Sequence, residues 1–432
     1  MTSYYDGLKQ ACQVAAPYGV AVRRELHMYP ELSALEFRTV RYLKSQLEQL
    51  GIPCVDIPDG GVVGVLEGSI PGRSVLLRAD CDALPIEESP NNAKQPKVCV
   101  SQISGVSHMC GHDLNSAMLM TAAKVLSERR DQIQGRILFL FERGEEGANN
   151  IYHVMKYFER EKTQIDCVLA LHGDADLPVG KYSVMPGGMV AGSIGFGFEV
   201  KGEGGHGSRP DLCNNPVDCF VAICGYLQNV RMKYTDPLKP FTSTVGVVHA
   251  GTRGNVIPDK LMFEGTARYF DREQGVLFDE RLRDGIAQIG ALYGCQCSIP
   301  FHLGPSFPVY NHPVVTDLCR RAVEKAWGED VLQETERSLG CESFSTLTAY
   351  YPGAMGYVGV RNEEKGMTIG VHNAAFEPDE DCIPLGATIY AAFALAFLSS
   401  GVSFNYSPYH KDIEALTQET GMPVPPHQVE PA

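Results

Sequence analysis

Short apolar segments that end in acidic side chains or histidines recur along the chain, with helical patterns between them. The four clearest are 74–82 (SVLLRADCD), 136–146 (RILFLFERGEE), 167–174 (CVLALHGD) and 367–373 (MTIGVHN). The segments 115–129 and 384–400 have the length and apolar content of helices that cover a sheet. This alternation of buried strands and helices predicts an α/β fold, in which we expect a mixed sheet flanked by helices.

The region between 188 and 302 has a different pattern. Its strand-like segments alternate more clearly between apolar and polar residues, and an amphipathic helical pattern follows at 277–294. Glycine-rich and proline-containing segments before and after it are typical of linkers. We therefore predict a larger domain made of 1–187 and 303–432, with a smaller α+β domain of 188–302 inserted into it.

The two ends of the chain give simpler predictions. Apolar residues spaced by three and four in 36–50, with Gly51 after them, predict the second of two N-terminal helices. The last thirty residues are rich in proline and polar groups, and we expect a surface tail there.

Composition excludes several kinds of partner. The chain has 432 residues and a formal net charge of −15, without a basic block, which argues against nucleic acid or an anionic membrane as partner. No segment approaches the about 18 consecutive apolar residues that a membrane span needs, and the N-terminus has no pattern of a secretory signal. The 14 cysteines follow no disulfide framework, so we expect reduced thiols and a cytoplasmic location.

The segment SHMCGHD contains the first candidate metal ligands. In an extended segment, Cys110 and His112 would point to the same side, where a thiolate and an imidazole could hold one metal ion or flank two. Taken alone, the pair favours a buried core cysteine beside a histidine over a metal site, because free cysteines so often belong to the core.

Further candidates lie at the ends of the predicted strands. Glu145 and Glu146 follow one strand, while His172 and His372 each end another. Separately, these residues could be an acidic turn and two interior histidines. In α/β sheets, however, the carboxyl ends of the strands form the binding crevice. We therefore predict a site for two divalent metal ions, with zinc, manganese, cobalt and nickel all open. Its five ligands are Cys110, His112, Glu146, His172 and His372.

Such a site predicts hydrolytic chemistry. A metal-bound hydroxide would attack a carbonyl, and Glu145, which is left without a metal, would act as general base and return the proton to the leaving amine. The alternative is a cysteine-nucleophile hydrolase that uses Cys110 with a histidine.

Ordered sequence blocks resemble the aminoacylase/carboxypeptidase family of dimetal metallopeptidases, especially its branch of hippurate hydrolase and plant indole-acetyl-amino-acid hydrolases. The resemblance runs from about residue 15 to 400, through LLRADCDALPIEE, SHMCGHD, GEEGA, LALHGD, KGEGGHGSRP, GNVIP, GTARYF and GVHNAAF. It implies a dimetal catalytic domain and an inserted lid domain that mediates homodimerisation. The implied substrate is a small molecule, an N-acyl amino acid or related amide; a dipeptidase or carboxypeptidase, or a catalytically silent binding relative, is the alternative.

The resemblance also implies roles for individual residues. Cys110 would bridge the metals, and Asp82 would orient a ligand. In the lid, His206 resembles the imidazole that reaches a neighbouring subunit's site and stabilises the oxyanion, and Asn255 and Arg268 resemble groups that bind the substrate carboxylate.

Three places depart from the branch's usual sequence. Gly-His-Thr is replaced by Leu114-Asn115-Ser116, proline-alanine by Arg143-Gly144, and the aspartate after Glu342 by Ser343. No presumed ligand is lost. We expect these residues near the pocket wall, where they would affect the acyl-group preference.

Overall fold

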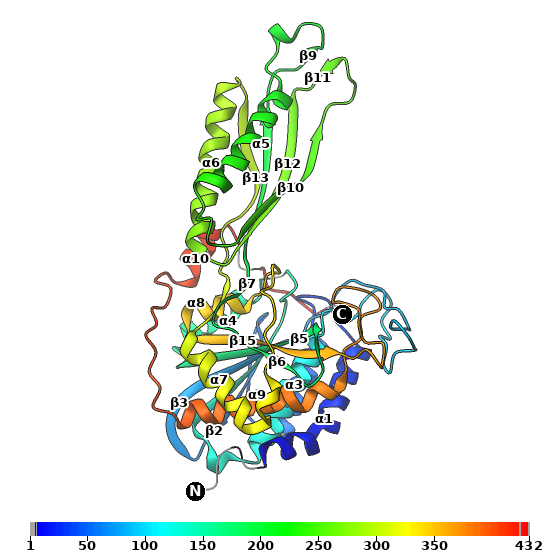
Figure 1. Cartoon of the computed structure of the whole chain (residues 1–432), viewed down its shortest axis with the longest axis vertical. Helices are drawn as coiled ribbons and strands as arrows, with labels where there is room; N and C mark the ends of the chain where they lie inside the picture. The colour runs from blue at the N-terminus through cyan, green and yellow to red at the C-terminus, as the bar shows by residue number, and fades with distance from the viewer. Residues whose placement is uncertain (1–4, 6, 148, 423–424, 431–432) are drawn as a thin grey trace.

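A seven-stranded sheet lies at the centre of the larger domain of this computed structural model, which describes residues 5, 7–147, 149–422 and 425–430 (Figure 1). Its strand order is β1-β2-β4-β3-β5-β15-β6. Strands β4, β3, β5 and β15 are mutually parallel, while β1, β2 and β6 pair antiparallel at the edges. The predicted mixed sheet flanked by helices is confirmed. The strands are β1 Cys54–Ile57, β2 Gly61–Glu67, β3 Ile70–Asp80, β4 Gln134–Glu142, β5 Cys167–Pro178, β6 Tyr182–Ser183 and β15 Gly353–Arg361.

Side chains of each central strand alternate between two apolar layers, because successive residues of a strand point to opposite faces. In β3, Val75 and Leu77 join one core and Leu76 the other. The first face is covered by α1 Leu8–Met28, α3 His112–Ser127, α7 Pro313–Trp327 and α9 Ile383–Ser399. The second is covered by α4 Ile151–Arg160, α8 Phe344–Tyr350 and α10 Ile413–Thr420. The two predicted N-terminal helices are present as α1 and α2 Phe37–Gln49, and Gly51 has a left-handed φ of 69°.

One segment is long and apolar enough to cross a membrane, which corrects the expectation that none is. Glu380–Ser399 spans 20 residues with a mean hydropathy of 1.8. Within the described chain, 89% of its apolar window is buried, because α9 packs against α1, α3 and α7. Core packing therefore accounts for its composition.

The second sheet stands apart from the first and projects from it (Figure 1). Its antiparallel order is β10-β12-β8-β13, and helices α5 and α6 bury an aromatic core against it. A small pair, β9 and β11, lies at the far end, and β7 pairs with β14 near the first sheet. We call residues 192–303, which make up this unit, the lid. The elements of the lid, and the β7–β14 pair beside it, are β7 Gly187–Val190, β8 Gly192–Lys201, β9 Gly205–His206, α5 Pro216–Lys233, β10 Phe241–Ala250, β11 Val256–Ile257, β12 Lys260–Tyr269, α6 Arg272–Leu292, β13 Gln296–Leu303 and β14 Val309–Asn311.

The C-terminal residues form more than the expected surface tail. Helix α10 buries Ile413 and Leu416 in the second core of the larger domain. Glu419, at its end, binds Lys411 at 2.6 Å and Arg272 of lid helix α6 at 2.7 Å, and Tyr409 donates a further hydrogen bond to it. The tail therefore contacts both the larger domain and the base of the lid.

Two strand predictions need correction. Residues 367–373 do not form a strand; β15 occupies that place in the sheet, and His372 lies in the loop beyond it with φ of 61°. His172 does not end its strand either, because β5 continues to Pro178.

Candidate metal centre

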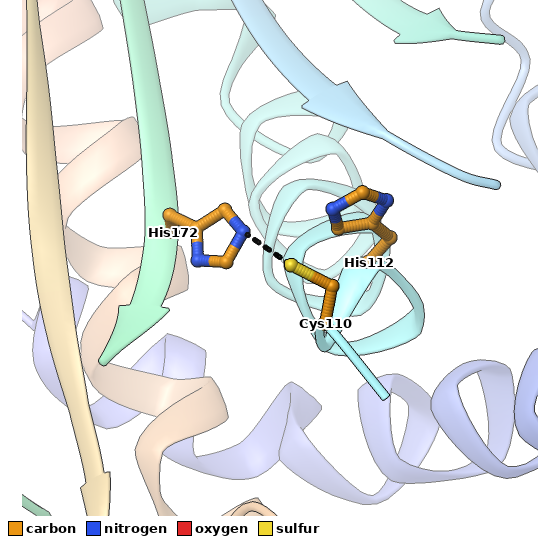
Figure 2. Close-up of side chains that lie close together, drawn as sticks. All are labelled: Cys110, His112 and His172. Atoms are coloured by element: carbon orange, nitrogen blue, oxygen red, sulfur yellow. Dashed lines mark hydrogen bonds between the residues drawn. The ribbon is translucent and has the colours of Figure 1, made fainter. Parts of the chain in front are cut away.

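Cys110 and His112 lie where a loop enters α3, a helix that begins at His112. The extended conformation expected for 110–112 is wrong, because Gly111 has a left-handed φ of 88°. The turn still brings both side chains together with His172, so that one ligand atom from each lies within 4.8 Å of the others. Figure 2 shows the three side chains converging, His172 from β5 and the other two from the start of α3.

The imidazoles are oriented by their second ring nitrogens. His172 Nδ1 donates to the Gly173 carbonyl at 2.8 Å, so its Nε2, 3.6 Å from Cys110 Sγ, presents a lone pair (Figure 2). His112 Nδ1 lies 2.8 Å from Asp82 Oδ1, which leaves Nε2 for the site. Asp82 also accepts a hydrogen bond from the Glu146 backbone N–H at 2.9 Å. This carboxylate therefore orients one candidate ligand and anchors the backbone of another, as supporting groups of metal sites do.

Glu146 and His372 form a second group around the same thiol. His372 Nε2 lies 3.3 Å from Cys110 Sγ and 3.2 Å from Glu146 Oε1. The His372 backbone N–H donates to the Met109 carbonyl at 2.6 Å, which ties its loop to the segment that carries Cys110. Cys110, Glu146 and His372 thus make one triad of possible ligands, and Cys110, His112 and His172 make another. The five predicted ligands come together, with the cysteine common to both triads.

The chemistry of these residues fits divalent metal ions. His112 Nε2 and Glu146 Oε1 are buried without a hydrogen-bond partner among the described residues, and buried polar atoms rarely remain so unless a ligand or ion satisfies them. Burial opposes positive charge on His112, yet the neighbouring Asp80 and the hydrogen bond to Asp82 raise its pKa well above the usual range. The surroundings therefore favour a cation at this position.

Glu145 lies beside this group but is held differently. One of its oxygens belongs to a set with His112 and Glu146, and its Oε1 accepts a hydrogen bond of 3.0 Å from the Ser343 backbone N–H. Burial, and then the negative charge of Glu342, raise the pKa of Glu145 well above that of a free carboxyl. Such a pKa suits a group that accepts and returns a proton.

A cavity of about 840 Å³ opens in front of these residues. Its wall includes Cys110, Glu145, Glu146, His172 and His372, together with the end of β5 and the segment 333–342. This volume is in the range of small-molecule sites. Asp174, Asp176, Glu334 and Glu336 line it with one cation, Arg337.

The lid residues singled out from the sequence lie elsewhere. His206 and Asn255 sit at the far end of the lid, next to β9 and β11, and both are exposed (Figure 1). Arg268 lies on β12 and donates to the Ala267 carbonyl at 3.0 Å. None of the three lines the cavity that contains Glu145. His206 Nδ1 accepts the Ser208 backbone N–H at 3.1 Å, which puts the ring proton on Nε2.

None of the side chains at the departing positions lines the cavity, but Ser343 lies near the cavity wall as expected, because its N–H donates to the wall residue Glu145. Asn115 donates to Asp80 Oδ1 at 2.9 Å, and Ser116 donates to the Asp80 carbonyl at 2.8 Å. Arg143 binds Glu36 at 2.9 Å. These side chains support the strand ends that carry the site.

Sequence reasoning missed Arg78, which lies under the site. It is fully buried in β3 and contacts three carboxylates, those of Glu142, Asp80 and Glu342, at 2.7, 2.9 and 3.0 Å. The available signal was an arginine within the apolar segment SVLLRAD, because a buried charge requires partners.

Together, the mixed sheet, the shared-cysteine triads and the adjacent glutamate define a metallohydrolase. Residues 76–396 match peptidase family M20/M25/M40. Thermostable carboxypeptidase 1 of Saccharolobus solfataricus is 33% identical over 395 residues, 91% of this chain and 98% of that protein. IAA-amino acid hydrolase ILR1-like 2 of Arabidopsis thaliana is 31% identical over 399 residues, with 91% and 88% covered.

A solved structure has the same fold. The Bacillus subtilis YXEP protein, a dinuclear metal binding peptidase from the M20 family, superposes with a TM-score of 0.75 at 28% identity, covering 89% of this chain and 99% of that chain. The chain belongs to peptidase family M20/M25/M40, which confirms the resemblance, and it is a hydrolase that acts on amide bonds.

Proposed function

We propose that this protein hydrolyses the amide bond of an N-acyl amino acid or a related small amide. The observation that carries the proposal is the pair of triads that share Cys110, with Glu145 beside them at the wall of one cavity. The similarity to an IAA-amino acid hydrolase supports this substrate class.

We further propose that Cys110, His112, Glu146, His172 and His372 hold two divalent ions per subunit, zinc or manganese in preference to cobalt or nickel. When bound, such ions polarise an amide carbonyl and lower the pKa of water. Thiolate, imidazole and carboxylate donors together suit these metals.

The remaining steps belong to the protein's own side chains. Glu145, held through Oε1 by the Ser343 amide, takes a proton from the attacking water and returns it to the leaving nitrogen. Asp82 keeps His112 in the tautomer that presents Nε2. His206 carries its proton on Nε2, and this N–H would stabilise the oxyanion in the site of a second copy by a hydrogen bond. Asn255 and Arg268 would bind the substrate carboxylate. The working unit would be a homodimer formed through the lid, in the cytoplasm.

A panel of N-acyl amino acids and dipeptides, assayed by release of free amine, tests the proposal. N-acyl amino acids should be cleaved, chelation should stop the reaction, and Glu145→Gln should lower kcat by at least about a hundredfold. Full activity of Glu145→Gln with normal metal content would refute the mechanism, whereas a wild-type protein that binds metal and cleaves nothing in the panel would favour a role as a binding protein.

The similarity to a carboxypeptidase supports a second candidate, a peptidase of the same family that cleaves dipeptides or C-terminal residues. Faster turnover of dipeptides than of N-acyl amino acids in the same panel would favour it. A cysteine nucleophile is disfavoured because burial raises the pKa of the Cys110 thiol well above the usual range, whereas nucleophilic cysteines have lowered pKa values.

A further inference from the structure

The charged groups beneath the candidate site form one buried cluster around Arg78. Its guanidinium binds Glu142 through Nε, and Asp80 and Glu342 through Nη1. The remaining nitrogen, Nη2, donates to the Ser343 hydroxyl at 2.8 Å. The cluster reaches the site on one side through Asp80, whose Oδ2 lies 3.9 Å from His112 Nε2.

On the other side, the hydrogen bond that links the cluster to Glu145 among the described residues comes from Ser343. The Ser343 hydroxyl accepts from Arg78 and donates to Glu142 Oε1 at 2.6 Å. The backbone N–H of the same residue donates to Glu145 Oε1 at 3.0 Å. A single residue therefore joins the buried ion cluster to the proposed general base.

We propose that Ser343 is a positioning residue for Glu145, and that Ser343 and Glu142 act as a matched pair. The proposal rests on the function of Glu145 proposed above. The hydroxyl clamps the backbone at 343 between a cation and a carboxylate, and the clamped amide fixes one oxygen of Glu145. The other oxygen is then kept in one orientation for proton transfer, a step whose rate is sensitive to small displacements.

The pairing follows from the donor and acceptor chemistry. Facing Glu142 Oε1 at 2.6 Å, residue 343 must supply a hydrogen-bond donor, while it must accept from Arg78. Serine and threonine do both. The aspartate that the family resemblance would imply at this position has no proton to donate when ionised, and it would add a buried negative charge against Glu142. The Ser343 hydroxyl therefore satisfies both of its neighbours, Glu142 as a donor and Arg78 as an acceptor.

Four variants test the proposal with N-benzoylglycine and N-acetyl-L-methionine as probes, and with the best substrate of the panel. Ser343→Ala should lower kcat by about tenfold to a hundredfold with KM and metal content unchanged. Ser343→Thr should keep kcat within about threefold, since it retains the hydroxyl. Ser343→Asp should lose at least as much as Ser343→Ala. The double variant Glu142→Gln with Ser343→Asp should recover at least about tenfold, because the glutamine amide donates to the new carboxylate.

A structural readout separates positioning from a general loss of stability. In metal-free crystals of Ser343→Ala, the Glu145 carboxylate should leave its contact with the amide of residue 343. The matched control is Ser345→Ala, which changes a buried serine in the first turn of α8, the helix that Ser343 precedes; it should keep wild-type kcat and geometry.

The proposal would be overturned by wild-type kcat in Ser343→Ala or Ser343→Asp. It would also be overturned if Glu145 were not displaced in the crystals, or if the loss of activity followed a loss of metal. Failure of the double variant to recover activity would remove the pairing. If Glu145→Gln is inactive while Ser343→Ala is fully active, only this inference fails; full activity of Glu145→Gln would instead remove the role proposed for Glu145, and absence of hydrolysis by the wild type would remove the proposed function.

Discussion

Replacing Leu416 by alanine should release helix α10 from the larger domain. This helix has eight residues, too few to be stable in isolation. It is held by Ile413 and Leu416, both almost fully buried, and by Asp412, which caps its first turn through the Ala415 N–H at 2.8 Å. Leu416 is therefore the side chain whose loss most directly weakens the docking.

The size of the effect follows from the burial of Leu416. Deleting a buried leucine side chain costs about 2–5 kcal/mol, and the lower end applies where neighbours can collapse into the space. A peripheral helix can shift in this way, so we expect about 2 kcal/mol, which is roughly a 30-fold increase in the population with α10 detached. The melting temperature should change less, because the rest of the fold remains closed.

Hydrogen exchange of wild type and Leu416→Ala measures this directly. Amides of 413–420 should lose protection by roughly 30-fold, and the Gly304 amide, which donates to the Thr420 carbonyl, should lose protection with them. Leu238→Ala, at a side chain that is 91% exposed, is the matched control and should leave both regions unchanged. Unchanged protection in Leu416→Ala would refute the view that this side chain anchors the C-terminal segment.

Three further predictions concern metal, pH and the partner subunit. Chelation should abolish hydrolysis and zinc or manganese should restore it, while Cys110→Ser should lower the metal content measured by atomic emission. Burial opposes the charge of Glu419, but hydrogen bonds from its neighbours outweigh burial and lower the pKa of this carboxyl from 4.5 to about 2. The stability that the Glu419 carboxylate contributes is therefore complete above pH 4.5 and is lost as the pH falls towards 2. Glu419→Gln should therefore lower the hydrogen-exchange protection of the amides of 413–420 at neutral pH, and a difference that does not shrink in acid would contradict the assignment. Mixing inactive Glu145→Gln and His206→Ala subunits should restore about one quarter of wild-type activity, because half of the randomly formed dimers contain one complete site; no recovery would indicate that His206 does not act across subunits.

The five candidate ligands were predictable because each follows or precedes a strongly patterned segment. Asp82, Glu145 and Glu146 come just after the apolar strands β3 and β4, and parallel pairing brings these strand ends to one edge. The apolar pattern was misleading at His372, because the short apolar segment before this residue forms a loop and not the predicted strand. That loop is held by the hydrogen bond from His372 N–H to Met109, a long-range contact that periodicity does not encode.

The buried charged residues beneath the site were not predictable either, because their contacts are also long-range. Arg78 is one charged residue in an apolar strand, and its partners Glu142 and Glu342 are separated from it by 64 and 264 positions of the numbering. Only the folded sheet brings them into contact. Likewise, nothing local in the polar C-terminal residues indicates that Ile413 and Leu416 complete the second core.

The residues at which this chain departs from the branch's usual sequence therefore affect the groups that support the site rather than the shape of the cavity. Asn115, Arg143 and Ser343 bind buried carboxylates, and none of them lines the described cavity. Each supplies an additional donor to a buried carboxylate, and a buried carboxylate is costly unless its oxygens are paired. Residues that choose among acyl groups must instead contact the substrate, and the segment 333–342, with Arg337 among acidic neighbours, is a part of the cavity wall that contains none of the candidate ligands. Exchanges within 333–342 should accordingly alter KM values between substrates, whereas exchanges at the three buried donors should alter kcat for all of them alike.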